Sequence, residues 1–205
     1  DNHEVVFATN VLGHFALAGE LLTVLASTSR TYGEVARMAW LGSTSTSMWR
    51  YDPVDPQLEK SYSPWRAYVQ SKIATTSIGL EADRRLRAAG VAVASVVAHP
   101  GYSTSGRTRG ITGVNEPTRG TRFADNLQTP ITQSKEHGAW APVRALIDPS
   151  VEGGQYWGPR FIAKGAPRLG KPAAITTDPE VAERLWNAAA DATGVVWPFS
   201  RAARA

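Results

Sequence analysis

The stretch VAVASVVAHPG, residues 91 to 101, carries the clearest β-strand pattern in the sequence. It is rich in β-branched valine, has no charged residue before His99, and ends in a Pro-Gly pair that is typical of a turn. A strand that is apolar on both of its sides is typical of a parallel sheet with both faces covered. The stretch therefore predicts an α/β fold with a loop at the carboxyl end of this strand.

On either side of this strand, helix and strand patterns alternate along the chain. Residues 36–45 (ARMAWLGSTS) are a short apolar run that ends in small hydroxyl residues, which predicts a second buried strand. The helix between the two strands is expected over residues 63–89, with Ser63 as its cap and Gly90 after its end. The other expected elements are a helix over 4–27, a long loop over 102–128, a helix over 132–147, a short strand over 153–159 and a helix over 177–194. This alternation predicts a parallel sheet with helices on both faces.

The composition fits one soluble globular domain that comprises residues 1–205. Hydrophobic residues make up 42% and charged residues 20%, and the lack of cysteine excludes disulfides and thiolate metal sites. The net charge of +4 comes from scattered basic residues, and the four histidines show no metal-binding spacing, so we expect neither a nucleic-acid partner nor a metal. No apolar run looks long enough to cross a bilayer and no secretory signal opens the chain, so we expect no membrane span and a cytoplasmic location.

A tyrosine and a lysine lie four residues apart in the predicted helix, at Tyr68 and Lys72. Residues at this spacing project from the same helix face, one turn apart. A lysine ammonium close to a phenol favours the ionised phenol, which can exchange a proton with an alkoxide or an alcohol near neutral pH. The same spacing also fits an ordinary amphipathic helix whose lysine extends to solvent. The pair alone therefore leaves catalysis and packing open.

The predicted topology brings further polar residues towards this pair. One strand ends in small hydroxyl residues, Ser43 and Ser45, and the next ends in Pro100 and Gly101. Ligands in open parallel sheets bind outside the carboxyl ends of the strands, which is where all four residues fall. Asn10 adds an amide within an otherwise apolar helix, and a buried amide needs a hydrogen-bond partner. We expect these groups to converge on one edge of the sheet.

Four motifs in this order resemble the short-chain dehydrogenase/reductase family: TNVLGHF (9–15), LGSTS (41–45), YVQSK (68–72) and AHPGY (98–102). The extended loop before the tyrosine helix is most similar to the branch with retinol-dehydrogenase-like and protochlorophyllide-reductase-like enzymes. The resemblance implies the C-terminal part of a Rossmann-like doubly wound parallel sheet. It also implies hydride exchange between NADP or NAD and a small carbonyl or alcohol substrate, with NADP slightly favoured.

The resemblance assigns a catalytic role to each matching residue. Tyr68 would be the general acid/base, and Lys72 would favour its ionised form and hydrogen-bond the nicotinamide ribose. Ser43 would hold the substrate oxygen, with Ser45 as the alternative if the register of the loop differs. Asn10 would hold a water that links the lysine to solvent. The residues that the resemblance places beside the cofactor are Tyr68, Lys72, Pro100, Gly101, Thr104 and Ser105.

One part of the family pattern is not found in the sequence, the glycine-rich strand-turn-helix whose backbone N–H groups bind the cofactor pyrophosphate. The nearest glycine pattern, GRTRGITG (106–113), follows the wrong strand, so we interpret it as a loop. Residue 1 matches the family's mid-chain helix, so we expect a partial chain that lacks on the order of 100 residues, at ~30 or more per βαβ unit.

Two other hypotheses remain. The chain could be a truncated, non-catalytic remnant or interaction module that cannot bind a cofactor by itself. It could also be a catalytic half that pairs with a separate nucleotide-binding chain. Members of the family often form dimers or tetramers, and this branch also includes monomers. The resemblance therefore allows a homo-oligomer through the helices that carry Asn10 and Tyr68, and the sequence does not decide between the two.

Overall fold

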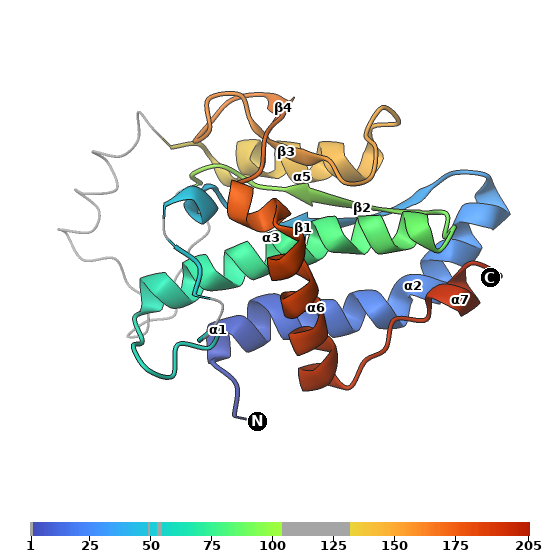
Figure 1. The fold of residues 1–205 in the computed structure, drawn as a ribbon. Helices are drawn as coiled ribbons and strands as arrows, with labels where there is room; N and C mark the ends of the chain where they lie inside the picture. The colour runs from blue at the N-terminus through green and yellow to red at the C-terminus, as the bar shows by residue number, and fades with distance from the viewer. Residues whose placement is uncertain (1, 49, 53–54, 104–131) are drawn as a thin grey trace, which may run out of the picture.

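The chain folds around a four-stranded sheet (Figure 1). The structure is a computed structural model that describes residues 2–48, 50–52, 55–103 and 132–205. The strands are β1 (Ala36–Leu41), β2 (Val93–Ala98), β3 (Tyr156–Pro159) and β4 (Pro167–Leu169), in the order β1-β2-β3-β4. The first three are mutually parallel, as predicted, whereas β4 runs antiparallel to β3. Sequence reasoning missed β4 because its three residues, Pro-Arg-Leu, carry no strand pattern.

The register of the sheet places the carboxyl ends of β1 and β2 side by side. Leu41 pairs with Ala98, so the chain leaves both strands at the same edge. Val97 pairs with Tyr156, which brings the end of β3 to that edge as well. The loops that start at Gly42 and at His99 therefore lie together, as the sequence predicted for its candidate site.

Helices cover both faces of the sheet: α5 lies on one face, α2 and α3 on the other, and α6 packs across α3 (Figure 1). The helical segments are α1 (Val5–Phe7), a π-helical turn (Ala8–Leu12), α2 (Gly13–Tyr32), a 3₁₀ turn (Thr44–Ser47), α3 (Pro64–Ala88), α5 (Lys135–Ile147), a second 3₁₀ turn (Ala174–Thr177), α6 (Pro179–Thr193) and α7 (Phe199–Ala202). Val97 and Tyr156 belong to the core under α3, and Val96 and Trp157 to the core under α5. The predicted doubly wound, Rossmann-like arrangement is confirmed.

The caps of α3 and α6 follow their sequence signals. The Ser63 hydroxyl accepts a hydrogen bond from the Arg66 N–H at 3.2 Å, with Pro64 in the first helical turn. The Asp178 carboxylate accepts the Glu180 N–H at 2.9 Å. These side chains satisfy backbone donors that have no partner inside the helix, which fixes where each helix begins.

The N-terminal helix is longer than predicted. Its three segments run without a break from Val5 to Tyr32, whereas the sequence pattern suggested an end near residue 27. Hydroxyl side chains in the added turn bond to carbonyls one turn earlier, as Ser29 does to Leu25 at 3.1 Å, and are thereby satisfied inside the helix. The helix ends at Gly33, whose φ of 70° is the left-handed conformation common after a helix.

This helix is also rich in apolar residues, with a mean hydropathy of 1.5 across its most apolar part. Within the described residues it is the one helix long and apolar enough to cross a membrane, judged by length and composition alone. The sequence pattern did not indicate this length, because polar residues such as Asn10, His14 and Glu20 interrupt the apolar run. A core helix meets the same two criteria, and one face of this helix, including Phe15 and Leu22, is fully buried in the core.

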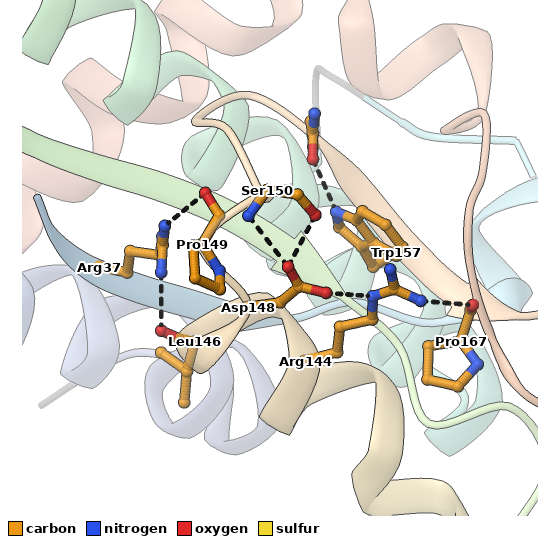
Figure 2. Close-up of polar contacts among 9 residues, drawn as sticks. Arg37, Arg144, Leu146, Asp148, Pro149, Ser150, Trp157 and Pro167 are labelled. Carbon is orange, nitrogen blue, oxygen red and sulfur yellow. Dashed lines mark hydrogen bonds and ion pairs between the residues drawn. The ribbon is translucent and has the colours of Figure 1, made fainter.

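Polar contacts fasten α5 to the sheet (Figure 2). Arg37 of β1 donates hydrogen bonds to the carbonyl oxygens of Leu146 and Pro149, at 3.2 and 3.4 Å. Arg144 pairs with Asp148 at 2.9 Å, and its guanidinium lies 4.6 Å from the Trp157 ring centroid. The helix α5 therefore contacts both β1 and β3, the outer strands of the parallel part of the sheet, and holds these strands in register.

Candidate active site

Tyr68, Lys72 and Ser43 lie together at the carboxyl edge of the sheet, as predicted. The Tyr68 hydroxyl and the Ser43 Oγ are 3.3 Å apart. The Lys72 ammonium donates to the Leu41 carbonyl oxygen at 2.8 Å and lies 5.9 Å from the Tyr68 ring centroid. Burial lowers the pKa of Lys72. The helix α3 supplies the pair from one face, and the end of β1 supplies the serine.

Ser45 extends this arrangement into a chain of three hydroxyls. Its Oγ lies 2.9 Å from the Ser43 Oγ, which also accepts the Ser45 backbone N–H at 3.2 Å. Three hydroxyls carry three protons, and two hydrogen bonds between them use two. One O–H proton is left to donate to an oxygen atom placed beside Ser43 and Tyr68. The sequence treated Ser45 as an alternative to Ser43, whereas the structure joins the two.

Gly42 directly precedes Ser43, and the packing around it is close. A Cβ at this position would lie 3.0 Å from Val97 Cγ1 and 3.1 Å from Thr76 Oγ1. Such distances are tighter than ordinary contacts, so a larger residue would displace the turn that carries Ser43. The glycine lets the backbone leave β1 directly against β2.

The loop before α3 is attached to α3 through Gln70, a residue that sequence reasoning missed. The buried Gln70 amide accepts the Asp52 N–H at 2.8 Å and donates to the Asp55 carbonyl oxygen at 3.1 Å. The Asp55 carboxylate in turn accepts the backbone N–H groups of Glu59 and Lys60. These contacts fix the loop beside the helix turn that carries Tyr68.

Asn10 lies in the π-helical turn and contacts the Tyr68 helix through Ser71. Its Nδ2 donates to the Ser71 Oγ at 3.0 Å, and Ser71 donates to the Tyr68 carbonyl oxygen at 2.8 Å. The Asn10 carbonyl oxygen, within this π-helical turn, accepts from the Thr75 hydroxyl at 3.1 Å. Asn10 thus supports the backbone of the site, and its predicted link to Lys72 through water stays a prediction.

The Pro100-Gly101 turn lies at the same edge, beside the end of β2. Gly101 has a φ of +68°, and a Cβ there would lie 2.3 Å from the Ala163 carbonyl oxygen, so only glycine fits. Gln133 donates to the Pro100 carbonyl oxygen at 2.6 Å and accepts the Gly165 N–H at 3.0 Å. The predicted cofactor residues Thr104 and Ser105 lie outside the described residues.

Gln133 also explains why α5 begins later than the predicted residue 132. Its backbone N–H bonds to the Tyr102 carbonyl oxygen at 2.9 Å, and it forms a bridge with Ser103. The Ser134 hydroxyl then caps the helix by accepting the His137 N–H. Nothing in the sequence around Gln133 distinguishes this contact from an ordinary first helical turn.

His99 and Tyr156 form a buried, uncharged pair next to the serine turn. Their rings stack with centroids 5.3 Å apart, and the Tyr156 hydroxyl lies 3.5 Å from the Ser43 carbonyl oxygen. Burial lowers the pKa of His99 to about 4 and raises the pKa of Tyr156 to about 12. The Gly101 N–H donates to the His99 Nδ1, so the neutral ring carries its proton on Nε2. Both groups are therefore neutral at pH 7.

The buried His99 predicts a loss of stability in acid. An unfolded histidine, with a pKa of about 6.5, binds a proton as the pH falls, while folded His99 stays neutral down to about pH 4. The free energy of unfolding should fall over this window by an amount of the order of 3 kcal/mol. Urea unfolding of the wild type and His99→Asn at pH 7, 5.5 and 4.5 measures this. In His99→Asn the free energy of unfolding should change less with pH than in the wild type. The control, His14→Gln, replaces an exposed histidine and should keep the wild-type pH dependence. The same pH dependence in all three proteins would contradict the assignment of the acid effect to His99.

Comparisons with known proteins agree with this geometry. No family model matches the chain. Over 96% of its own length, the chain is 32% identical to polyprenol dehydrogenase of Mus musculus. Over 98% of its own length, it is 30% identical to retinol dehydrogenase 13 of Homo sapiens. The crystal structure of an uncharacterised protein from Mycobacterium paratuberculosis matches 94% of the chain, with a TM-score of 0.68 and 28% identity.

The chain spans a little over half of each of these proteins: 58% and 57% of the two dehydrogenases and 59% of the solved structure. The match nevertheless includes nearly all of this chain, and the four motifs that suggested the family, at 9–15, 41–45, 68–72 and 98–102, all lie within the described residues. By its sequence relatives and its fold, the chain belongs to the short-chain dehydrogenase/reductase family.

Proposed function

We propose that this chain carries the catalytic residues of an oxidoreductase that exchanges a hydride between NADP or NAD and a carbonyl or alcohol substrate. The observation that supports this best is the chain of hydroxyls Ser45, Ser43 and Tyr68, which has one proton free for a substrate oxygen. The relatives are named for polyprenol and retinol, which are both alcohols, and this favours an alcohol/carbonyl pair as substrate and product.

The free proton of the hydroxyl chain is that of Ser43, because the Tyr68 hydroxyl donates to the Ser43 Oγ. In the reducing direction, the Tyr68 hydroxyl exchanges this bond for one to the substrate oxygen and gives its proton to that oxygen as negative charge develops there. Ser43 donates a hydrogen bond to the same oxygen, and such preorganised donors are usually the largest contribution to catalysis. Lys72 places a positive charge on the same helix face as Tyr68, which stabilises the tyrosinate left behind. In the oxidising direction the same groups act in reverse, with Tyr68 as the base.

The residues at this edge fit the nicotinamide end of a cofactor. An ammonium has three N–H donors, and the described contacts of Lys72 use one of them on the Leu41 carbonyl oxygen. The other two N–H donors are available to ribose hydroxyls. Pro100 and Gly101 form the turn that follows β2, the strand adjacent to β1. A bound nicotinamide would supply or accept the hydride, and the chain's own residues would control the proton.

The function can be tested by separating the roles of Ser43 and Ser45. We expect Ser43→Ala to lower kcat with a carbonyl substrate about 100-fold, because one donor to the developing oxyanion is lost. Ser45→Ala should lower it less than about tenfold, because Ser45 acts only by orienting Ser43. Oxidation of NADPH or NADH with a panel of aldehydes and ketones is the assay. An equal loss for both variants would contradict these roles. A folded protein that neither binds NADPH or NADH nor turns over any aldehyde or ketone of the panel would favour the non-catalytic hypothesis.

A further inference from the structure

A cavity beside the serine turn is lined by three cationic side chains and, in the part of the chain that the structure describes, by no carboxylate. We propose that the substrate of this site carries an anionic group, a carboxylate or a phosphate, which Arg160, Arg168 and Lys171 bind. This inference rests on the proposed function, because it names the class of substrate for the same site.

The cavity has a volume of about 690 Å³, and its wall includes Thr44, the residue that follows Ser43. Thr44 and Ser47, in the 3₁₀ turn that Ser43 caps, form one wall. Tyr156 forms another wall, and its hydroxyl lies 3.5 Å from the Ser43 carbonyl oxygen. A substrate whose reacting oxygen lies at Ser43 and Tyr68 can therefore extend its other end into this cavity.

The hairpin formed by β3 and β4 places the cations around the cavity. Arg168 pairs with Gly158 in the antiparallel register, so both residues face the same side of the sheet. The Gly158 backbone lies directly against the His99 ring, since a Cβ there would come within 1.8 Å of Nε2. This is the side of the sheet that α3 covers, and Arg168 lines the cavity on it. The short β4 strand, which has no counterpart in the sequence prediction, thus adds charge next to the site.

The charges around the cavity are unbalanced. Among the described residues, its lining includes Arg160, Arg168 and Lys171 and contains no Asp or Glu. Within the part of the chain that the structure describes, none of the three cations forms an ion pair. The remaining titratable groups on the wall, His99 and Tyr156, are neutral at pH 7 and do not offset the charge. An anionic ligand would gain from all three cations without displacing an acidic partner.

The cavity also has an apolar part, which sets the form of the substrate. Met48, Ile162 and Leu169 line it and are at least half exposed. A carbonyl compound with a short apolar body and a terminal anion would cover these side chains and reach the cations. The reaction stays balanced: the aldehyde, the reduced nicotinamide and one proton give the alcohol and the oxidised nicotinamide, and the anionic group is unchanged.

The test compares three aliphatic aldehydes of equal length that end in a methyl group, a carboxylate or a phosphate. With the full-length protein, kcat/KM for one of the anionic aldehydes should exceed that for the methyl aldehyde. In Arg168→Gln this preference should fall about tenfold, since a charge-assisted hydrogen bond is lost. The matched control, Arg30→Gln, removes an exposed arginine on α2 and should change neither value. Added salt should reduce the preference because the cations are exposed.

A binding measurement without cofactor separates this inference from the proposed function. Calorimetric titration with the corresponding anionic alcohol should show binding that Arg168→Gln weakens about tenfold. Binding of the anionic alcohol without turnover of any aldehyde would overturn the proposed function alone. Equal kcat/KM for all three aldehydes would overturn the inference. It would also be overturned if Arg168→Gln raised the KM for NADPH and left the preference for the anionic aldehyde unchanged.

Discussion

Replacing Tyr68 by Phe in the full-length protein is expected to lower turnover about 10³-fold. The substitution removes only the hydroxyl, which lies 3.3 Å from the Ser43 Oγ and is the proton donor to the substrate oxygen in the proposed reaction. General acid catalysis by one positioned side chain contributes roughly 10²–10⁴-fold, and the same hydroxyl also stabilises the developing charge. The loss should fall on kcat more than on KM, because the hydroxyl acts mainly in the transition state.

The variant should still bind the cofactor, since Lys72 and the Pro100-Gly101 turn are unchanged. Quenching of tryptophan fluorescence by NADPH or NADH measures this directly. Tyr62→Phe is the matched control: Tyr62 is 54% exposed, lies just before the same helix and should leave turnover unaltered. Unchanged turnover in Tyr68→Phe would refute the assignment of Tyr68, whereas loss of cofactor binding would show that the phenylalanine disturbs the site.

The parts of the fold that the sequence predicted well are those that local chemistry determines. The uncharged valine-rich run around Val97 could only be a buried strand, and Ser63 with Pro64 fixed the start of α3. Tyr68 and Lys72 were placed correctly because a helix of known start leaves no choice about which residues share a face. Their meeting with Ser43 followed from the parallel topology alone.

The parts that the sequence missed depend on contacts between distant segments. Gln133 contacts Pro100, 33 residues away, and nothing in either segment's pattern indicates the other. Arg168 lies in a three-residue strand that exists only because β3 offers it an edge. Ser45 was predicted as an alternative to Ser43 because the sequence does not show that a 3₁₀ turn brings both hydroxyls within 2.9 Å. Such features arise from tertiary packing, which overrides local preference.

The largest expected effect on stability comes from Phe15→Ala in the N-terminal helix. Phe15 is fully buried, and its ring contacts Trp186 and Trp197 with centroids 4.9 and 5.5 Å away. Removing a ring from a packed core loses its transfer free energy and leaves a cavity, so the free energy of unfolding should fall by about 3–5 kcal/mol. Urea unfolding followed by tryptophan fluorescence reports on the two neighbouring indoles directly.

Leu17→Ala provides the comparison, because Leu17 lies on the same helix and is 57% exposed. If this helix packs as a core element, Leu17→Ala should change the free energy of unfolding by about 0.5 kcal/mol or less, far below the effect at Phe15. Length and hydropathy cannot distinguish a core helix from a membrane-spanning one, whereas the contrast between two apolar residues on opposite faces can. Equal effects at both positions would mean that Leu17 is also covered in the folded protein, and the described packing of α2 would then be incomplete.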